Sequence, residues 1–510
     1  MGQEKIEDRR SGRRRRPRAW WAVGVVAVLA LVAGACGGSD SDSGDDSGDG
    51  GGDAAGVVNK DDCPVADVES ASAPTTVTLW HAYVGLQAST LQQIADAYNA
   101  SQDKVKIDVQ AQGTYEELLK KFQDALANPS SLPDLVLTED TTTQFMIDSG
   151  VVVPAASCQE ADPGSDATYE DVLPAVTSAY TVDGVLWPGA FSVSMPVLYA
   201  NKAILGQAGV DTAALPTTID ELRTAAEKIK AANIPGMKAP LVIKVDSWFV
   251  ENWLTGAGKS LVNENNGRDA LATKSELVQP DTTKIYEWFK SMIDDGLATA
   301  VPSSSTGVDE YLALNAKSSA MLIQTSTAIS TVAALLEGSV SQDQLGDVGI
   351  DANVDKSLDV EVALQPGLEE AGQGQIGGSA WYMVKTDDAL GVPAAWDFIK
   401  YFLETPNQVQ WTLQGSYLPV LKSAQDDPTL QQEFTTTTKG KWLNTAYQGL
   451  QNLNADFPGP VIGPFNEFRA IMRSSLDSVA FNGVGTEEAI KKADTDFQTA
   501  LDRYKADVGG

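Results

Sequence analysis

The stretch VTLWHAYVGLQASTLQQIADAYNASQDKVKIDVQAQGTYEELLKKFQDALANPSSLPDLVLTED, from Val77 to Asp140, decides the fold class. It begins with an apolar run at 77–80 and ends with another at 135–137, and apolar residues alternate with polar ones at 105–109. Two segments with apolar residues at helical spacing separate these three: Leu91–Tyr98 and Tyr115–Leu126. The order strand, helix, strand, helix, strand predicts a parallel, doubly wound sheet.

Later segments repeat this pattern. Apolar residues recur at helical spacing in three more places, 218–229, 285–293 and 395–402. The chain has 510 residues, more than one compact core usually holds, so at least two lobes are expected. No Pro/Gly-rich linker divides the halves, which indicates that the chain passes between the lobes more than once. We therefore predict an α/β protein of two lobes, each built on a doubly wound sheet.

The first 36 residues have the pattern of an export signal. Seven arginines between residues 9 and 18 precede an apolar run at 19–32, and small residues lead up to Cys36. This order is typical of a secretory signal peptide. A retained transmembrane helix is the alternative, although the run is shorter than the ~20 apolar residues that a span needs.

Cys36 refines this prediction. Small residues before a cysteine resemble the bacterial lipobox, although Ala33 stands where that motif usually has Leu. Residues 1–36 are therefore predicted to be a lipoprotein signal peptide, and acylated Cys36 to anchor the exported chain to the outer face of the cell membrane. An ordinary signal peptide followed by an incidental cysteine is the alternative.

Residues 37–62 are predicted to be a disordered acidic tether. The part up to Gly56 has no large apolar residue, so it cannot bury enough surface to offset the entropy of ordering. The remaining cysteines, Cys63 and Cys158, are expected to form one disulfide, because such bonds persist outside the cell. Two separate buried thiols are the alternative. No CxxC occurs, which argues against redox and zinc-ribbon chemistry.

The net charge limits the possible partners. The chain carries 37 basic and 69 acidic residues and a formal net charge of −32. The predicted signal peptide is net basic, so the exported part is still more acidic. A polyanion of this size argues against nucleic acid and anionic lipid as partners of the folded region.

The sequence offers no convincing catalytic or metal site. The only histidine, His81, has no GxSxG motif to accompany it, and ligands for zinc are lacking. The GAGKS at 256–260 is not a phosphate loop, because Trp253 stands where that motif requires Gly. Glu139 and Asp140 are adjacent on a strand and so are expected to point to opposite faces. We predict no enzymatic activity, no metal and no cofactor; a secreted glycosidase acting through Asp140 is the remote alternative.

Seven short stretches, in this order and spacing, carry a family resemblance: LWHAYVG (79–85), GTYEELLKKF (113–122), LPDLVLTED (132–140), FSVSMPVLYANK (191–202), GGSAWYMV (377–384), GSYLPV (415–420) and GPFNEFRAI (463–471). Together they resemble the extracellular solute-binding proteins of ABC importers, in the group that captures sugars and glycerol phosphates. The likeness covers the chain from Val77 to Tyr504. It is strongest to components that bind glycerol-3-phosphate or glycerophosphodiesters.

The resemblance implies two lobes that close over a solute. It places residues 63–190 with 376–420 in an N-terminal lobe and 191–375 with 421–510 in a C-terminal lobe. Strands that cross between lobes would form a hinge near 187–196, 374–378 and 418–421. The implied partners are a small polar solute and a permease in the cytoplasmic membrane, beside which the lipid anchor would keep a monomeric binder.

The resemblance also implies eight solute-binding residues: Tyr115, Asp140, Ser194, Trp248, Gly377, Gly378, Tyr417 and Arg469. Asp140 matches the family's carboxylate that accepts polyol hydroxyls, with Glu139 facing away. Arg469 stands where the family grips phosphate, and its planar fork suits that anion; a surface ion pair is the alternative. The family's tryptophan aligns with Trp248 or equally with Trp253. Packing within a lobe is the alternative role for the aromatic residues, Ser194 and the glycines.

The favoured solute is glycerol-3-phosphate or a glycerophosphodiester, because a neutral sugar does not need Arg469. A binder of di- or oligosaccharides is the first alternative. An adhesin or signalling ectodomain without a small ligand is another.

Overall fold

The computed structural model describes residues 57–304, 309–337 and 358–509. The predicted signal peptide, Cys36 and the tether up to residue 56 lie outside these ranges. Within them, no helix combines the length and the apolar character needed to cross a membrane.

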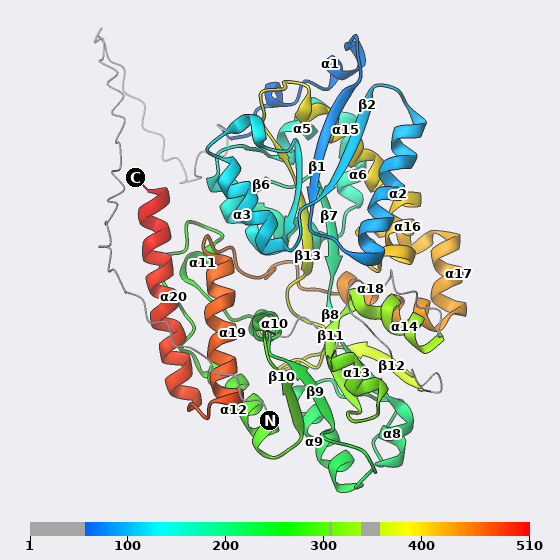
Figure 1. Ribbon diagram of the computed structural model, residues 1–510, viewed down its shortest axis with the longest axis vertical. Helices are drawn as coiled ribbons and strands as arrows, with labels where there is room; N and C mark the ends of the chain where they lie inside the picture. Colours follow the sequence, from blue (N-terminus) through cyan, green and yellow to red (C-terminus); the bar gives the residue numbers. More distant parts are fainter. Residues whose placement is uncertain (1–56, 305–308, 338–357, 510) are drawn as a thin grey trace, which may run out of the picture. The chain divides into compact units, whose positions relative to one another are not determined.

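The first sheet is built as the opening stretch predicts. Its strands are β1 (Thr75–His81), β2 (Val105–Ala111), β3 (Leu135–Glu139), β4 (Val152–Val153), β7 (Ala190–Ser194) and β13 (Gly377–Val384), and α2 (Gly85–Ser101) and α3 (Tyr115–Ala125) connect the first three. The order is β2-β1-β3-β13-β4, and β1 is parallel to both β2 and β3. β1 and β2 lie side by side in Figure 1. The sheet is not parallel throughout, because β13 runs antiparallel to β3, β4 and β7.

A second sheet repeats this arrangement. Its strands are β8 (Pro196–Asn201), β9 (Leu241–Lys244), β10 (Ala298–Val301), β11 (Met321–Thr325) and β12 (Val360–Leu364), in the order β10-β9-β11-β8-β12. β9 is parallel to β10 and β11, and β8 is antiparallel to β11 and β12. The helices expected near 218–229 and 285–293 are α9 (Ile219–Ala231) and α12 (Pro280–Asp294). The two sheets confirm the predicted two-lobed α/β fold.

Local chemistry explains where the site-forming helix α3 begins. The Thr114 hydroxyl accepts from the Glu117 N–H at 3.2 Å, and the Glu117 carboxylate accepts from the Thr114 N–H at 2.8 Å. This reciprocal cap satisfies two N–H groups that a helix start leaves unpaired. Leu118 and Phe122 then bury one face of the helix. Tyr115 is thereby fixed as the first residue of α3.

The other helices complete the two cores: α1 (Val65–Ser70), α4 (Thr143–Asp148), α5 (Ala155–Ala161), α6 (Asp166–Asp171), α7 (Pro174–Tyr180), α8 (Lys202–Gln207), α10 (Ser247–Gly256), α11 (Asn263–Gly267), α13 (Asp309–Asn315), α14 (Ile329–Glu337), α15 (Gly391–Leu403), α16 (Thr405–Gly415), α17 (Pro428–Thr436), α18 (Thr438–Gln451), α19 (Phe465–Phe481) and α20 (Thr486–Val508). A short hairpin joins β5 (Thr181–Val182) to β6 (Val185–Leu186). The apolar faces of α15 and α16 join the core of the first sheet, and those of α10, α12, α19 and α20 join the core of the second.

The chain passes from sheet to sheet at short connections. Only Met195 separates β7 from β8, and residues 365–376 lead from β12 back to β13. At the third expected crossing, Leu418 and Leu421 still bridge to Val193 and Val172, next to the first sheet. After β13 the chain stays with the first core through α18, and it returns to the second core in the connection between α18 and α19. The lobe boundaries themselves, including 420/421, stay predictions, since buried residues of α17 and α18 belong to the first core while α18 also packs on β12.

The sulfur atoms of Cys63 and Cys158 lie 1.98 Å apart, which pairs the start of the described chain with α5. The bond in the exported chain stays a prediction.

Candidate functional site

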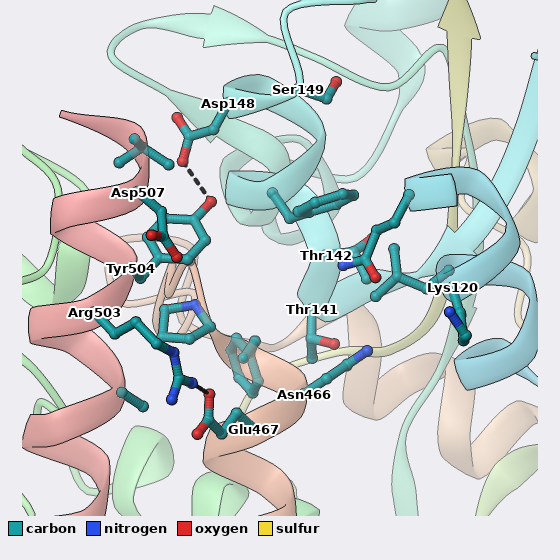
Figure 2. A pocket seen from close by; sticks show the side chains of 18 of the residues that line it. Lys120, Thr141, Thr142, Asp148, Ser149, Asn466, Glu467, Arg503, Tyr504 and Asp507 are labelled. Carbon is teal, nitrogen blue, oxygen red and sulfur yellow. Dashed lines mark hydrogen bonds and ion pairs between the residues drawn. The ribbon is translucent and has the colours of Figure 1, made fainter. Parts of the chain in front are cut away.

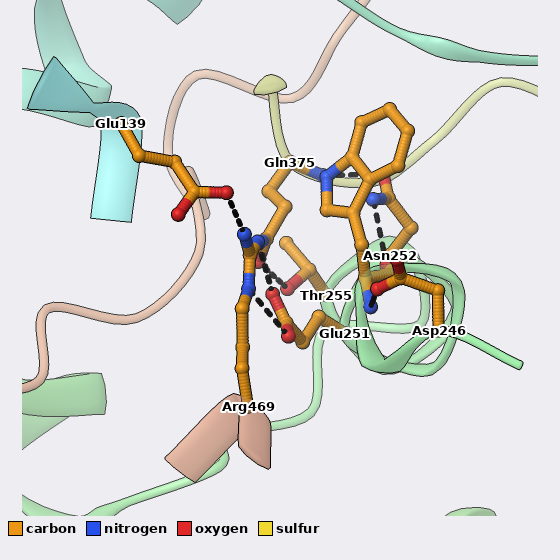
Figure 3. A network of polar contacts seen from close by, with 8 residues as sticks. Glu139, Asp246, Glu251, Asn252, Thr255, Gln375 and Arg469 are labelled. Atoms are coloured by element: carbon orange, nitrogen blue, oxygen red, sulfur yellow. Dashed lines mark hydrogen bonds and ion pairs between the residues drawn. The ribbon is translucent and has the colours of Figure 1, made fainter. Parts of the chain in front are cut away.

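A buried arginine joins elements from both lobes. Arg469 on α19 donates from Nε and Nη2 to the two carboxylate oxygens of Glu251 on α10, at 3.1 and 2.9 Å. Its Nη1 donates to Oε1 of Glu139, at the end of β3, at 2.6 Å (Figure 3). The Glu251 side chain is 0% exposed and that of Glu139 is 25% exposed. Arg469 is thus held twice within its own lobe and reaches the other lobe once.

One crossover residue supports this arrangement. Gln375 donates from its side chain to Glu251 at 2.9 Å and from its backbone N–H to the Asn252 side chain at 3.1 Å. The Thr255 hydroxyl donates to the Gln375 side-chain oxygen at 3.3 Å (Figure 3). Because Gln375 lies in the 365–376 connection, the orientation of Glu251, and through it of Arg469, is coupled to the segment that links the sheets.

Three carboxylates surround the single guanidinium. Burial raises the pKa of Glu139, although Arg469 opposes this effect. Burial also raises the pKa of Asp140 well above its ordinary value, again against Arg469. Burial alone would lower the pKa of Arg469, but Glu251, Glu139 and Asp140 hold it well above its ordinary value. Glu139 and Asp140 therefore bind protons more readily than exposed carboxylates do.

The expectation that Glu139 faces away is wrong, because its carboxylate binds Arg469 directly. The alternation of side chains that supported it holds only inside a strand. β3 ends at Glu139, and Asp140 begins the 3-10 turn η4 (Asp140–Thr142). The change of backbone conformation brings both carboxylates toward the same guanidinium.

Two glycines allow the strands and an indole to approach closely. Gly377 on β13 pairs with Ser194 on β7. A Cβ at Gly377 would lie 2.5 Å from the Trp248 ring and 3.2 Å from the Ser194 hydroxyl. Gly378 has a φ of +122°, and a Cβ there would lie 1.8 Å from the Ser192 carbonyl oxygen. Any larger residue at either position would push these groups apart.

The two tryptophans have different roles. Trp253 is 2% exposed, packs edge-on against Trp288 and donates from its indole N–H to the Pro366 carbonyl at 2.8 Å. It is a core residue. Trp248 is only partly buried and lies against Gly377, and its indole N–H is shielded from solvent without a hydrogen-bond partner among the described residues. Of the two candidates, the structure therefore brings Trp248 to the site.

A group of tyrosines lies next to Gly378. The Tyr115 hydroxyl is buried and interacts with the Tyr417 hydroxyl. Burial raises the pKa of Tyr115 well above its ordinary value, and the neighbouring Tyr417 and Tyr83 add to this. The ring of Tyr417 stacks on Trp411 with centroids 5.3 Å apart and lies 5.7 Å from that of Tyr83. A Cβ at Gly378 would contact the same Tyr417 ring at 3.3 Å.

These contacts gather all eight predicted residues in one region, and their roles as solute ligands stay predictions. Sequence reasoning missed several residues that belong there: Tyr83, Thr141, Tyr180, Glu251 and Gln375. Glu251 had a usable signal, because an acid between two tryptophans on a mostly apolar helix usually needs a buried partner. Tyr83 directly follows the end of β1, where open α/β sheets place ligands.

Two hollows adjoin the region. A cavity of about 30 Å³ is lined by Asp140, Thr141, Tyr180, Arg268 and Gln375, among others. A larger pocket of about 660 Å³ lies between α3–α4 and α19–α20 (Figure 2). The Tyr504 hydroxyl donates across this pocket to Asp148 at 2.6 Å. Thr141 and Phe465 line both hollows, so these are neighbours.

No group of three or more His, Cys, Asp or Glu side chains within residues 57–304, 309–337 and 358–509 is arranged to hold a metal ion.

The chain matches the family described as bacterial extracellular solute-binding protein over residues 93–438. The sn-glycerol-3-phosphate-binding periplasmic protein UgpB of Escherichia coli (strain K12) is 24% identical over 416 residues, which are 80% of this chain and 89% of the relative. UgpB of Pectobacterium atrosepticum is 23% identical over 439 residues, 85% of this chain and 93% of the relative.

Solved structures are similar in fold. UgpB from Mycobacterium tuberculosis in complex with glycerophosphocholine superposes with a TM-score of 0.65 at 18% identity, covering 85% of this chain and 99% of that one. The cyclic alpha-maltosyl-1,6-maltose binding protein from Arthrobacter globiformis has a TM-score of 0.65 at 20% identity, covering 84% and 99%. At these identities the likeness shows the fold, which is that of two-lobed periplasmic binding proteins.

Proposed function

This chain belongs to the bacterial extracellular solute-binding protein family, and from that premise we propose that it captures a phosphate-bearing polyol, either glycerol-3-phosphate or a glycerophosphodiester. It serves as the solute-binding component of an ABC importer. The relatives that carry the name of a glycerol-3-phosphate binder align over most of both chains, which supports the choice of solute.

One observation carries the choice: Nη1 of Arg469 points across the lobe boundary at an anion. Glu251 fixes the guanidinium by two hydrogen bonds inside the second lobe. The remaining edge meets the Glu139 carboxylate of the first lobe. A phosphate has the same charge sign and acceptor geometry as that carboxylate and binds a guanidinium fork strongly. We assign the position of the Glu139 carboxylate to the solute's phosphate.

Phosphate and Glu139 then compete for one guanidinium. Because burial raises the pKa of Glu139 and Asp140, protonation reduces the repulsion that an incoming phosphate meets. Protonated carboxyls also donate hydrogen bonds to phosphate or hydroxyl oxygens. The affinity for a glycerophosphodiester, whose phosphate charge does not change in this range, is therefore expected to increase as the pH falls from neutral toward mildly acidic values.

Capture follows from the connections between the sheets. The short links at Met195 and 365–376 serve as the hinge, and a solute bound to one lobe draws the other over it. The tyrosines and Trp248 enclose its carbon-bound hydrogens, and Asp140 accepts from its hydroxyls. The permease then recognises the closed form.

The test is isothermal titration calorimetry with sn-glycerol-3-phosphate and glycerophosphocholine on protein starting at Val57. Removing Arg469 alone would leave Glu251 buried and unpaired, which is strongly destabilising. The informative variant is therefore the double change Glu251→Gln with Arg469→Gln, and Glu251→Gln alone is the matched control that retains the guanidinium. We expect the double variant to lose roughly 100-fold or more in affinity, consistent with about 3 kcal/mol for a charge-assisted pair. Unchanged affinity in the double variant would refute the assignment.

A di- or oligosaccharide binder is the second candidate, and the pocket of about 660 Å³ favours it. Phe145, Phe465 and Tyr504 line this pocket beside acidic side chains that can accept sugar hydroxyls. Maltose and maltotriose are suitable probes. Binding of either sugar that survives the double variant, together with no binding of the two phosphates, would support this candidate instead.

The setting of the binder is part of the proposal. An acylated Cys36 holds the exported monomer near its permease, residues 37–62 act as the tether, and a Cys63–Cys158 bond closes the start of the folded part. Mass spectrometry of the membrane-extracted protein should show a mature N-terminus at acylated Cys36, and Cys36→Ala should release the protein into the medium. No turnover of aryl glycosides is expected, since we assign no catalytic residue.

A further inference from the structure

Two residues with buried, unpartnered hydroxyls line the small cavity. Tyr180, the last residue of α7, is 1% exposed, and Thr141 in η4 is 7% exposed. Among the described residues, neither hydroxyl has a hydrogen-bond partner. Both line the cavity of about 30 Å³ together with Asp140. Buried polar groups are rarely left unpaired, because the loss of water costs free energy, so an absent group is expected to satisfy both.

The size of the cavity limits that group. A volume of about 30 Å³ holds one water-sized group. A single hydroxyl, with the carbon that carries it at the entrance, fits.

The remaining polar groups suit a hydroxyl. Most of the Arg268 N–H groups are engaged with backbone: they donate to the carbonyls of Gly459 at 2.7 Å, Ser178 at 3.0 Å, Ala179 at 3.2 Å and Thr181 at 3.3 Å. Gln375 is engaged with Glu251. Asp140 repels a second anion and offers acceptor oxygens. A solute hydroxyl can donate to the Asp140 carboxylate and accept from the hydroxyl of Tyr180 or Thr141, so it matches the acceptor and the donors that line the cavity.

The cavity lies directly beside the guanidinium assigned to phosphate. The Phe465 ring forms one wall, and the Arg469 guanidinium lies over the same ring at 5.2 Å from its centroid. Two further lining residues contact the partners of Arg469. Asp140 adjoins Glu139, and Gln375 binds Glu251. The walls come from residues of both predicted lobes.

We propose that this cavity is the subsite for the terminal hydroxyl of the polyol, and that Tyr180 and Thr141 are solute-binding residues that determine specificity. The proposal rests on the proposed function and deepens it: a solute with phosphate at one end and a free hydroxyl at the other is selected over one that lacks the hydroxyl. Sites that hydrogen-bond a solute hydroxyl discriminate in this way, because its absence leaves their polar groups unpaired.

The test compares two ligands in two proteins by calorimetry. The ligands are sn-glycerol-3-phosphate and propane-1,2-diol 1-phosphate of matching configuration, which lacks only the terminal hydroxyl. The wild type should bind the first at least about ten-fold more tightly, the value of roughly one hydrogen bond. In Tyr180→Phe the affinity for glycerol-3-phosphate should fall about ten-fold while that for the deoxy ligand is unchanged. Thr141→Val should shift selectivity in the same direction.

Stability separates a solute-binding role from a structural one. The Tyr180 hydroxyl has no partner in the ligand-free protein, so Tyr180→Phe should leave its Tm unchanged or raise it. Tyr447→Phe is the matched control, because that buried hydroxyl donates to the Leu421 carbonyl at 2.7 Å. It should lower Tm and leave both affinities unchanged.

Three results would overturn the subsite. Equal effects of Tyr180→Phe on both ligands, or no effect on either, would mean that the cavity holds an ordered water only. A wild type that binds both ligands equally would show that the hydroxyl goes elsewhere, with the proposed function intact. A wild type that binds neither phosphate would refute the proposed function and the subsite together.

Discussion

Two arginines near the junction of the lobes, Arg469 and Arg268, illustrate two uses of the same side chain. Arg469 is surrounded by carboxylates, which hold its pKa well above the ordinary value. Arg268 donates to backbone carbonyls from residues 178–181 and Gly459, and burial lowers its pKa to about 10. Carbonyl oxygens satisfy the N–H groups but do not neutralise the charge. Arg268 therefore fastens loops, whereas Arg469 forms an exchangeable ion pair.

The backbone around Arg268 fits a fastening role. The three residues Glu264, Asn265 and Asn266 have left-handed φ values of 55°, 49° and 63°. Such conformations cost free energy and persist only when their surroundings impose them. The Asn266 side chain accepts from the Leu261 N–H at 2.9 Å, and Arg268 then holds the segment against residues 178–181. No comparable strain surrounds Arg469, which lies within the regular helix α19.

The largest expected effect is a loss of stability when Arg469 loses its buried partner Glu251. Glu251→Ala removes the 0% exposed partner of Arg469 and should lower the free energy of unfolding by about 3–5 kcal/mol, since a buried guanidinium loses its main counter-charge. Urea denaturation measures this. The matched variant Glu251→Gln keeps hydrogen-bonding atoms in place and should lose less than half as much. A loss below about 1 kcal/mol for Glu251→Ala would show that Glu139 suffices alone.

Removing Arg268 should lower the stability of the protein much more than its affinity for the solute. Arg268→Met leaves several carbonyls without their donor and should cost about 2–4 kcal/mol of unfolding free energy. The affinity for glycerol-3-phosphate should fall far less than in the double variant at Glu251 and Arg469. Thermal denaturation and calorimetry on the same samples give both values. A loss of affinity as large as in the double variant would end the distinction between the two arginines.

Asp140 should make the stability of the ligand-free protein depend on pH. Its pKa is raised in the folded protein, so its carboxyl contributes most to stability at low pH, and that contribution is lost as the pH rises through the folded pKa. Asp140→Asn removes this cost and should stabilise the ligand-free protein at pH 7 by about 1 kcal/mol. The gain should shrink as the pH falls toward the ordinary carboxyl pKa near 4. Tm measured from pH 4 to 8 tests this, and a gain that grows on acidification would contradict the assigned direction.

The smallest effect concerns the ring beneath the paired arginine. Phe465→Leu keeps an apolar wall but removes the aromatic face that lies 5.2 Å from the Arg469 guanidinium. We expect a loss of about 1 kcal/mol in stability, from the contact and the smaller volume. The affinity for glycerol-3-phosphate should change less than about three-fold. An unchanged unfolding curve would show that the guanidinium is oriented by Glu251 alone.

The predictability of the site varies from residue to residue. The family motifs located all eight predicted residues, and the structure gathers them in one region. Glu139 was misplaced because a strand's alternation was extended one residue beyond its end. Tyr180 and Thr141 carry no pattern that separates them from core and turn residues. Only their unpaired hydroxyls on a shared cavity single them out.

The sequence by itself determined the α/β class and the alternation of β1, α2, β2, α3 and β3, because hydrophobic periodicity and capping are local properties. The tertiary structure decided which charges meet. Glu139 and Arg469 are 330 residues apart in the chain, and the strand end and the helix face that join them belong to different lobes. Coulomb energy depends on distance and burial, which no local pattern specifies. Arg469 therefore forms ion pairs with Glu251 and Glu139, whereas the hydrogen bonds of Arg268 go to backbone carbonyls.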